Sequence, residues 1–268
     1  MLSKTAFIVL SCDKYSDLWP MYLHFFDKNW PDCKFDKYFI TNNKGIKHDG
    51  FKSLKIGEDL SWSDNLKKVL LQLKGRYDYV FISLEDVPII VQVNQKLFEK
   101  ILNLFFRLDG NFIALNNNTK HSSKFNEYFG IIEKGSLYRP TCEFSLWKIS
   151  VLEELLVSGE NAWEFEKYGA IRSDKFDNFY VVYDTLFKNC HTVVKGKWVR
   201  QSYRKIRSFG FEPNIETRPI FTVKEEIAHQ MYARLFGFIY KHFLSKTKLS
   251  RKIIYNIKGY NKLKRLYY

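Results

Sequence analysis

Residues 77–86 read YDYVFISLED, an apolar and aromatic run that ends in two acids. A run of this kind is typical of a central strand covered on both faces, because a half-exposed strand would alternate apolar and polar side chains. It stops at Glu85 and Asp86. The sequence therefore predicts a buried sheet with an acidic pair at the end of its central strand.

Strand and helix patterns alternate around this run. Short apolar stretches predict strands at residues 5–11, 35–41 and 111–115, and helical spacing predicts helices at residues 18–26, 61–73 and 94–108. This alternation favours an α/β fold with an open, mainly parallel sheet and helices on both faces. Ligands of such sheets bind at the carboxyl ends of the strands.

The second half is less regular. It predicts strands at residues 128–132, 141–147, 179–183 and 191–194, short helices at 151–157 and 161–167, and two helical patterns at 227–243 and 249–257. We therefore expect a catalytic domain over residues 1–221 and a basic amphipathic helical tail over residues 222–268.

The net charge of +14 is unevenly distributed. Residues 222–268 hold eleven Lys or Arg against Glu225 and Glu226, a net +9 that leaves +5 for residues 1–221. Lys outnumbers Arg by 32 to 11 in the whole chain, whereas base readout and bidentate phosphate contacts favour Arg. We expect the tail to bind an anionic membrane surface rather than nucleic acid.

Cysteine spacing and apolar segments predict the compartment. The four cysteines lie far apart without a C-x-x-C pair, which argues against a zinc site or a small disulfide framework. The apolar stretch at residues 6–10 is shorter than the roughly 7–15 residues of a signal peptide core, and no run of about 18 apolar residues occurs. We expect a cytoplasmic protein, peripheral on the inner face of the plasma membrane.

Common catalytic motifs are missing, since the chain has no G-x-G-x-x-G, G-x-x-x-x-G-K-[ST], H-E-x-x-H or G-x-S-x-G. The candidates that remain are Glu85 with Asp86, and a second acidic cluster around Trp163. A divalent ion bridging a diphosphate would balance carboxylates at a strand end. The alternative is a loop carboxylate bonded to backbone amides.

The order of SCDKYSDLW, SWSDNL, YVFISLEDVPI, EFSLWK and ENAWEFE resembles bacterial surface-polysaccharide (lipopolysaccharide or capsule) glycosyltransferases of the GT-A type, over residues 5–198. The resemblance implies a Rossmann-like GT-A nucleotide-diphospho-sugar transferase fold with C-terminal helices. It also implies transfer of a sugar from a nucleotide-sugar, with UDP preferred, to a hydroxyl of a glycan or lipid-linked glycan acceptor.

The resemblance also implies roles for individual residues. Nucleotide-sugar contacts fall on Ser11, Asp13, Tyr15, Trp62, Asn65, Glu85 and Asp86. Asp86 stands at the place of the family's D-x-D metal motif, with His191 as a late ligand for Mn²⁺ or Mg²⁺. Leu84 replaces the first aspartate of that motif, so a metal-free site stays open.

An inverting transfer needs a carboxylate that accepts the proton of the attacking hydroxyl. Glu164 and Glu166 are the first candidates, with Trp163 offering a flat face to the acceptor sugar. Glu143 is the third candidate, and Glu143 and Trp147 are also candidates for shaping the donor sugar site. The alternative for Trp147 is that it is simply packed, as is more common for an aromatic in a strand. The alternative is that the segment around Trp163 is core and its glutamates are solvated.

Two other functional classes stay open. A nucleotidyl- or phosphoglycerol-type transferase would use the same α/β pocket and the same carboxylates. A non-enzymatic basic protein that binds lipid or nucleic acid would use the 24 Phe and 17 Tyr for stacking. Because these aromatics lie mainly in apolar strands and helices, we expect them to be buried in the hydrophobic core. A homo-oligomer also stays open.

Overall fold

The structure is a computed structural model that describes residues 4–117, 119 and 121–239. The chain divides into two compact units. Unit 1 comprises Met1–Lys134 and Tyr138–Asn189, and unit 2 comprises Gly135–Leu137 and Cys190–Tyr268. The boundary falls after Asn189, and the catalytic domain of residues 1–221 stays a prediction.

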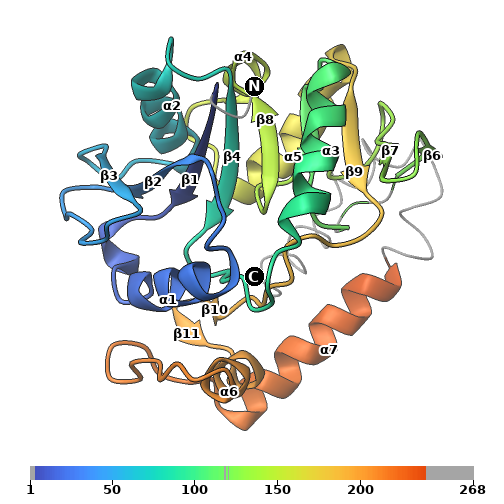
Figure 1. Cartoon of the computed structure of the whole chain (residues 1–268). Coiled ribbons are helices and arrows are strands. Elements are labelled where there is room, and N and C mark those ends of the chain that lie inside the picture. Colours follow the sequence, from blue (N-terminus) through green and yellow to red (C-terminus); the bar gives the residue numbers. More distant parts are fainter. Residues whose placement is uncertain (1–3, 118, 120, 240–268) are drawn as a thin grey trace. The chain divides into compact units, whose positions relative to one another are not determined.

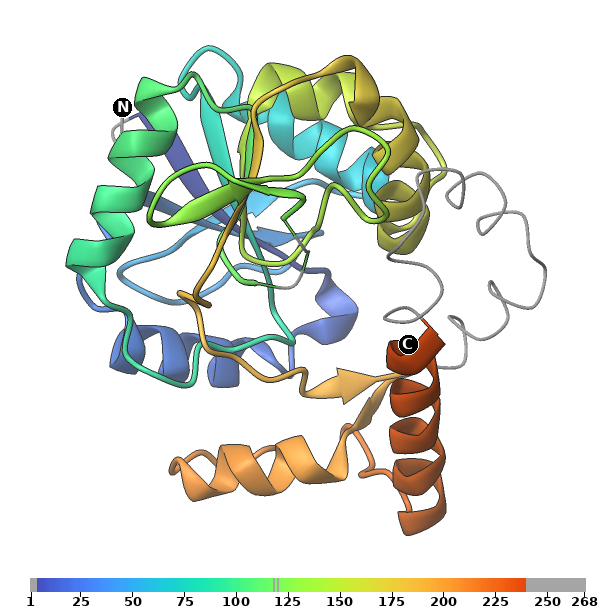
Figure 2. The ribbon, with the colours of Figure 1, turned by 90° about the vertical axis from the view of Figure 1, so that its right-hand side faces the viewer.

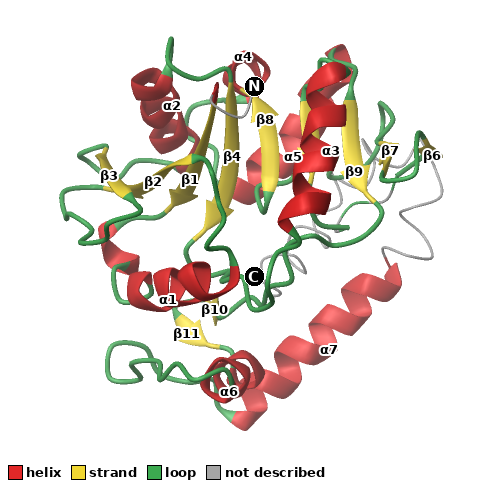
Figure 3. Cartoon of the chain, viewed as in Figure 1, coloured by secondary structure: helices red, strands yellow, loops and turns green. Residues whose placement is uncertain are grey.

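A nine-stranded sheet forms the centre of unit 1, in the order β3-β2-β1-β4-β8-β5-β9-β7-β6 (Figures 1 and 3). Its strands are β1 (Thr5–Leu10), β2 (Asp36–Thr41), β3 (Lys52–Lys55), β4 (Tyr79–Leu84), β5 (Phe112–Ala114), β6 (Ser123–Lys124), β7 (Phe129–Ile131), β8 (Ser145–Lys148) and β9 (Phe179–Val182).

The pairing is mixed. Strands β3, β2, β1 and β4 run parallel, as do β5 and β9. Strand β8 lies between β4 and β5 and is antiparallel to both. The predicted parallel sheet is thus confirmed for its first four strands, whereas β8 starts where its neighbour β4 ends.

Helices cover both faces of this sheet, as Figure 2 shows from the side. They are α1 (Trp19–Asn29), α2 (Trp62–Leu73), α3 (Gln95–Arg107), α4 (Ile149–Leu155) and α5 (Ala162–Arg172). Helices α1 and α3 belong to one hydrophobic core, and α2, α4 and α5 belong to the other. The predicted α/β class with a Rossmann-like sheet is confirmed.

Strand β4 explains why the central run is apolar throughout. Tyr79 and Phe81 pack into the core under α1 and α3, and Val80 and Ile82 pack into the core under α2, α4 and α5. All four are buried. Because successive side chains of a strand point to opposite faces, a strand covered twice needs apolar residues at every position.

Local caps fix where the helices begin. The backbone amide of Asp64 donates to Ser61 Oγ at the start of α2, and that of Leu97 donates to Asn94 Oδ1 at the start of α3. Side-chain oxygens of this kind satisfy N–H groups that have no partner in the first helical turn. The predicted helix starts at these two positions are confirmed, and α5 extends five residues beyond its predicted end, to Arg172.

Unit 2 contains a short antiparallel pair, β10 (Val193–Val194) with β11 (Lys197–Trp198), and two helices, α6 (Arg200–Ser208) and α7 (Val223–Ile239). The buried Trp198 anchors it, with Nε1 donating to the carbonyl of Asn214 at 3.1 Å. Helix α7 confirms the helical pattern up to residue 239. The rest of that pattern and the one at 249–257 lie outside the described residues.

No helix within the described ranges is both long enough and apolar enough to cross a membrane.

Candidate functional site

Three neighbouring strands bring polar side chains to one edge of the sheet. Leu10 pairs with Leu84, so Ser11 and Glu85 leave β1 and β4 at the same level. Ser145 opens the antiparallel strand β8 opposite Ile82, which places Glu143, two residues earlier, beside the end of β4. The predicted residues Ser11, Glu85, Asp86 and Glu143 therefore share the carboxyl edge of β1 and β4.

Glu85 is a buried carboxylate at this edge, only 9% exposed, and Asp86 follows it half-buried. Burial raises the pKa of the Cys12 thiol, and the negative charges of Asp59 and Glu85 raise it further. Cys12 is thereby kept in its protonated form. The raised pKa argues against a thiolate nucleophile at Cys12.

Glu143 is held by a partner that lies far away in sequence. Asn189 donates from Nδ2 to Glu143 Oε1 at 2.5 Å. Asn189 also forms a bridge with Ile89, three residues after Asp86. The segment that orients Glu143 thus runs beside the loop that follows the acidic pair.

The backbone beside Glu143 is strained. Phe144 has φ +41°, in the left-handed region that favours glycine. Its ring stacks on Phe187 with centroids 5.0 Å apart and planes 1° apart, and its carbonyl accepts from the amide of Leu115 at 2.9 Å. Strain that the surrounding packing maintains is characteristic of functional sites.

The three glutamates around Trp163 each have a partner in the protein. Glu164 completes the capping box of α5 by accepting from the Asn161 amide at 3.0 Å, and Glu160 pairs with Arg172 at 2.6 Å. Glu166 accepts from the amide of Cys142 at 3.0 Å, so it supports the segment that carries Glu143.

Trp163 itself is 44% exposed, which leaves its ring accessible. Its predicted role as an acceptor platform stays a prediction. Trp147 was expected to shape the donor sugar site, but it is fully buried and packs 4.3 Å from Phe112 and 5.9 Å from Phe179, centroid to centroid. The packed alternative therefore describes Trp147, because an aromatic on a central strand covered twice belongs to the core.

Asp13 braces a loop at the same edge. Its carboxylate accepts from the backbone amides of Asn42, Asn43 and Lys44 at 3.0–3.1 Å. Partial burial raises the pKa of Asp13, but the three N–H groups outweigh burial and hold the pKa below its ordinary value. Asp13 thus has a structural role in this loop, and its predicted contact with a nucleotide stays a prediction.

We expect Asp13→Asn to lower the melting temperature by a few degrees at pH 7, since about 1 kcal/mol corresponds to roughly 2–4 °C in a chain of this size. A lowered pKa contributes stability above the unfolded pKa of about 3.9, and this stability is lost as pH falls through the folded pKa. The difference from wild type should accordingly shrink below about pH 4. Thermal melts with the exposed loop variant Asp49→Asn as control check this, and a gap that widens in acid would contradict it.

The other predicted nucleotide contacts lie nearby. Ser11 Oγ accepts from Trp19 Nε1 at 2.8 Å, and Tyr15 ends a short 3-10 helix. Asn65 holds the loop before α2, because it donates to Asp59 at 2.8 Å and accepts from the amide of Leu60 at 3.0 Å. Their contacts with a nucleotide stay predictions.

Four buried side-chain polar atoms have no hydrogen-bond partner within the described part of the chain: Thr41 Oγ1, Trp62 Nε1, Ser63 Oγ and Thr141 Oγ1. Thr41 ends β2, Trp62 and Ser63 open α2, and Thr141 lies two residues before Glu143. All four therefore stand in segments that leave or enter the sheet at its carboxyl edge. Because a buried polar atom without a partner costs free energy, such a group calls for an explanation, and an ordered water or a ligand that enters after a local rearrangement would supply one.

The described residues contain no group of three His, Cys, Asp or Glu side chains placed to hold a metal ion. Glu85 and Asp86 are carboxylates of unit 1, and His191 is an exposed residue of unit 2. Two carboxylates do fit Mg²⁺ when phosphate oxygens of a substrate complete its coordination.

Sequence reasoning missed Thr141, Phe144 and Asn189. Each acts through a contact or a backbone angle that only the folded chain defines. The only sequence pattern near them is Asn-Cys-His at residues 189–191, and there the sequence predicted a role for His191 but not for Asn189.

No family model matches this sequence, and no curated protein is significantly similar to it. Among solved structures, the crystal structure of S. aureus TarS 1-349 has a TM-score of 0.43 and 10% identity, and covers 66% of this chain and 60% of its own. The crystal structure of S. aureus TarS has a TM-score of 0.44 and 10% identity, and covers 97% of this chain and 49% of its own. The crystal structure of A197 from STIV has a TM-score of 0.39 and 14% identity, and covers 73% of this chain and 89% of its own. This chain thus spans 60% or less of the two TarS chains.

Proposed function

We propose that this protein is a glycosyltransferase. It moves a sugar from a nucleotide-sugar, with UDP as the preferred carrier, to a hydroxyl of a glycan or lipid-linked glycan. The observation that supports this is the gathering of Glu85, Asp86 and Glu143 at one sheet edge, where the four buried polar atoms without partners also lie. In sheets of this class that edge is the ligand side.

The reaction needs one base and one way to stabilise a leaving diphosphate. The acceptor oxygen attacks the anomeric carbon, the bond from that carbon to the phosphate oxygen breaks, and the nucleoside diphosphate leaves with the bonding electrons. The hydroxyl proton passes to a carboxylate. Attack from the face opposite the leaving group inverts the configuration.

Glu143 is our choice for the base. It lies beside the end of β4, and the hydrogen bond from Asn189 Nδ2 orients its carboxylate, which can accept a proton when ionised. Glu164 serves the capping box, and Glu166 bonds the Cys142 amide, so both fit supporting roles better. Glu166 is then a positioning residue that acts through residue 142.

Glu85 and Asp86 are the residues that would hold a divalent cation arriving with the diphosphate. A bound Mg²⁺ or Mn²⁺ supplies charge neutralisation at the leaving group. The two carboxylates fix the position of the diphosphate on the sheet edge. The role of His191 as a metal ligand stays a prediction of the sequence. Residues 222–268, with their net +9, would hold the enzyme on the inner face of an anionic membrane, where a lipid-linked acceptor is presented.

The hydroxyls without partners provide a test with two readouts. Thr41→Val and Thr141→Val remove buried hydroxyls that have no partner in the described protein. We expect each variant to melt at or above the wild-type temperature without ligand, yet to bind its nucleoside diphosphate about 3- to 10-fold more weakly, the value of one hydrogen bond. Calorimetry with UDP, GDP, CDP and dTDP measures the binding.

Thr5→Val at the opposite end of β1 is the control, and it should leave nucleotide binding unchanged. Unchanged binding in both edge variants would remove these hydroxyls from the site. Absence of binding for all four nucleotides by the wild-type protein would count against the proposed function itself.

A further inference from the structure

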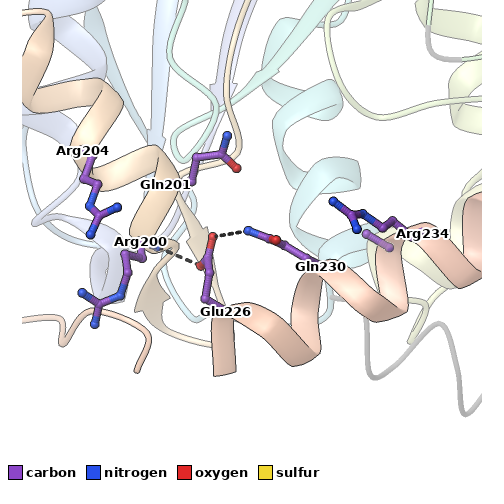
Figure 4. Close-up of a pocket in the computed structure, with 7 residues that line it drawn as sticks. Arg200, Gln201, Arg204, Glu226, Gln230 and Arg234 are labelled. Atoms are coloured by element: carbon purple, nitrogen blue, oxygen red, sulfur yellow. Dashed lines mark hydrogen bonds between the residues drawn. The ribbon is translucent and has the colours of Figure 1, made fainter. Parts of the chain in front are cut away.

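Unit 2 contains a pocket of its own. It has a volume of about 600 Å³ and lies between α6 and α7 (Figure 4). Its lining residues are Arg200, Gln201 and Arg204 from α6, and Glu226, Gln230, Ala233 and Arg234 from α7. Three arginines against one glutamate leave an excess of two positive charges.

Part of this lining is already committed to holding the two helices together. Arg200 donates from Nε and Nη2 to the carbonyl of Phe221 at 3.1 and 2.7 Å. Glu226 accepts from the backbone amide of Arg200 at 3.2 Å and from Gln230 Nε2 at 3.2 Å, as the dashed lines of Figure 4 show. The one acid of the pocket is therefore used inside the protein.

The side chains of Arg204, Arg234 and Gln201 are exposed and have no hydrogen bond or ion pair with any described residue. The guanidinium groups of Arg204 and Arg234 lie on opposite sides of the pocket (Figure 4), and each can bind a phosphate through paired hydrogen bonds. The pocket therefore suits a phosphate group.

An apolar stripe runs along α7 next to this pocket. Val223, Ile227, Met231, Leu235 and Phe238 follow each other at intervals of three or four residues, and all are between 47% and 66% exposed. At about 100° of rotation per residue, they cover one face of the helix. Ile227, Met231 and Leu235 directly follow the pocket residues 226, 230 and 234, so the two faces are neighbours.

We propose that this part of unit 2 binds the phosphate of an anionic phospholipid in a bilayer surface. Arg204 and Arg234 contact headgroup phosphates from the two sides of the pocket, Gln201 adds a neutral donor, and the apolar stripe of α7 enters the boundary of the acyl chains. An amphipathic helix binds in this way when apolar and cationic faces adjoin. This inference deepens the proposed function, since it gives the membrane contact a defined headgroup site.

A bilayer suits this surface better than the alternatives do. A soluble phosphate would use the arginines but leave the apolar stripe in water. A second copy of the chain would cover the stripe, but it would bring the same positive charges against these arginines. The surplus charge of residues 222–268 points to the same anionic partner.

The test compares two double variants of the full chain that each lose two positive charges. The first, Arg204→Gln with Arg234→Gln, removes two guanidinium groups from the pocket. The second, Lys205→Gln with Lys224→Gln, removes two exposed positive charges of the same helices outside the pocket. Binding to phosphatidylcholine vesicles that contain phosphatidylglycerol is measured by flotation at about 0.5 M NaCl, where a Debye length of about 4 Å suppresses diffuse attraction.

We expect the pocket variant to bind at least about tenfold more weakly than the lysine variant, the value of one or two charge-assisted hydrogen bonds. Arg204→Lys with Arg234→Lys keeps the positive charge but loses the paired hydrogen bonds of the guanidinium groups. Its vesicle binding should therefore lie between that of the pocket variant and that of the lysine variant. Circular dichroism melts establish that all variants fold. An equal loss of vesicle binding in the pocket and lysine variants would overturn the proposal that the pocket binds lipid, because only diffuse charge would then matter.

Two further outcomes would also overturn the proposal. The first is binding of glycerol phosphate that Arg204→Gln with Arg234→Gln abolishes, while vesicles bind neither protein. The second is a dimer in sedimentation that the pocket variant dissociates without a change in vesicle binding. Donor hydrolysis is measured in parallel, and its failure would affect the proposed function but not this lipid site.

Discussion

Glu143→Gln is expected to lower kcat by about 10²–10⁴, the usual loss when a general base is removed. The glutamine keeps the oxygen that accepts from Asn189 Nδ2, so the local geometry should persist. Donor affinity should change by only a few-fold, because the proton is transferred in the transition state and not on binding. Steady-state kinetics with the preferred donor and calorimetry of its diphosphate separate these two effects.

Glu164→Gln is the matched control. Glutamine at this position also completes a capping box, so the helix start should survive and the rate should stay within a few-fold of wild type. The opposite pattern, a large fall for Glu164→Gln and none for Glu143→Gln, would place the base on α5. Glu166→Gln distinguishes a positioning role from a catalytic one, because it should affect KM and kcat mildly.

Asp86→Asn should lower transfer by at least about 10², because it removes a charge that positions the diphosphate or its cation. Asparagine is nearly isosteric, so the melting temperature should hardly move. Asp49→Asn, exposed in the loop after β2, is the control for the loss of one carboxylate.

Chelation separates the two ways in which Asp86 can act. If EDTA reduces the wild-type rate as far as the substitution does, the carboxylate acts through a divalent cation. If wild-type activity survives EDTA while Asp86→Asn is inactive, Asp86 acts on the substrate directly. Normal turnover by Asp86→Asn would remove it from the site.

The parts of the fold that the sequence predicted are those with local causes. Strand β4 is covered on both faces and therefore requires an unbroken apolar run. Ser61 and Asn94 are capping residues, and they indicated the starts of α2 and α3. Strand β3 has only four residues, two of them lysines, so it carried no pattern. Helix α6 has one buried residue, Ile206, so it carried no apolar periodicity that predicts a helix.

The candidate site followed partly from sequence. The acidic pair was visible because carboxylates interrupt an apolar run, and the direction of β4 placed them at the ligand edge. The antiparallel direction of β8 was not visible, yet it is what brings Glu143 to the same edge. The pocket that contains Arg204 and Arg234 is lined by residues thirty positions apart in sequence, so no local pattern could predict it.

Hydrolysis of nucleotide-sugars tests the central claim most directly. The full-length protein is incubated with UDP-, GDP-, CDP- and dTDP-sugars without acceptor, and the released nucleoside diphosphate is measured for wild type, Asp86→Asn and Asp49→Asn. We predict release from at least one donor, with UDP-sugars preferred, by wild type and Asp49→Asn but not by Asp86→Asn. Release from none of them, together with turnover of CDP-glycerol or a nucleoside triphosphate, would contradict the account and favour a nucleotidyl- or phosphoglycerol-type transferase.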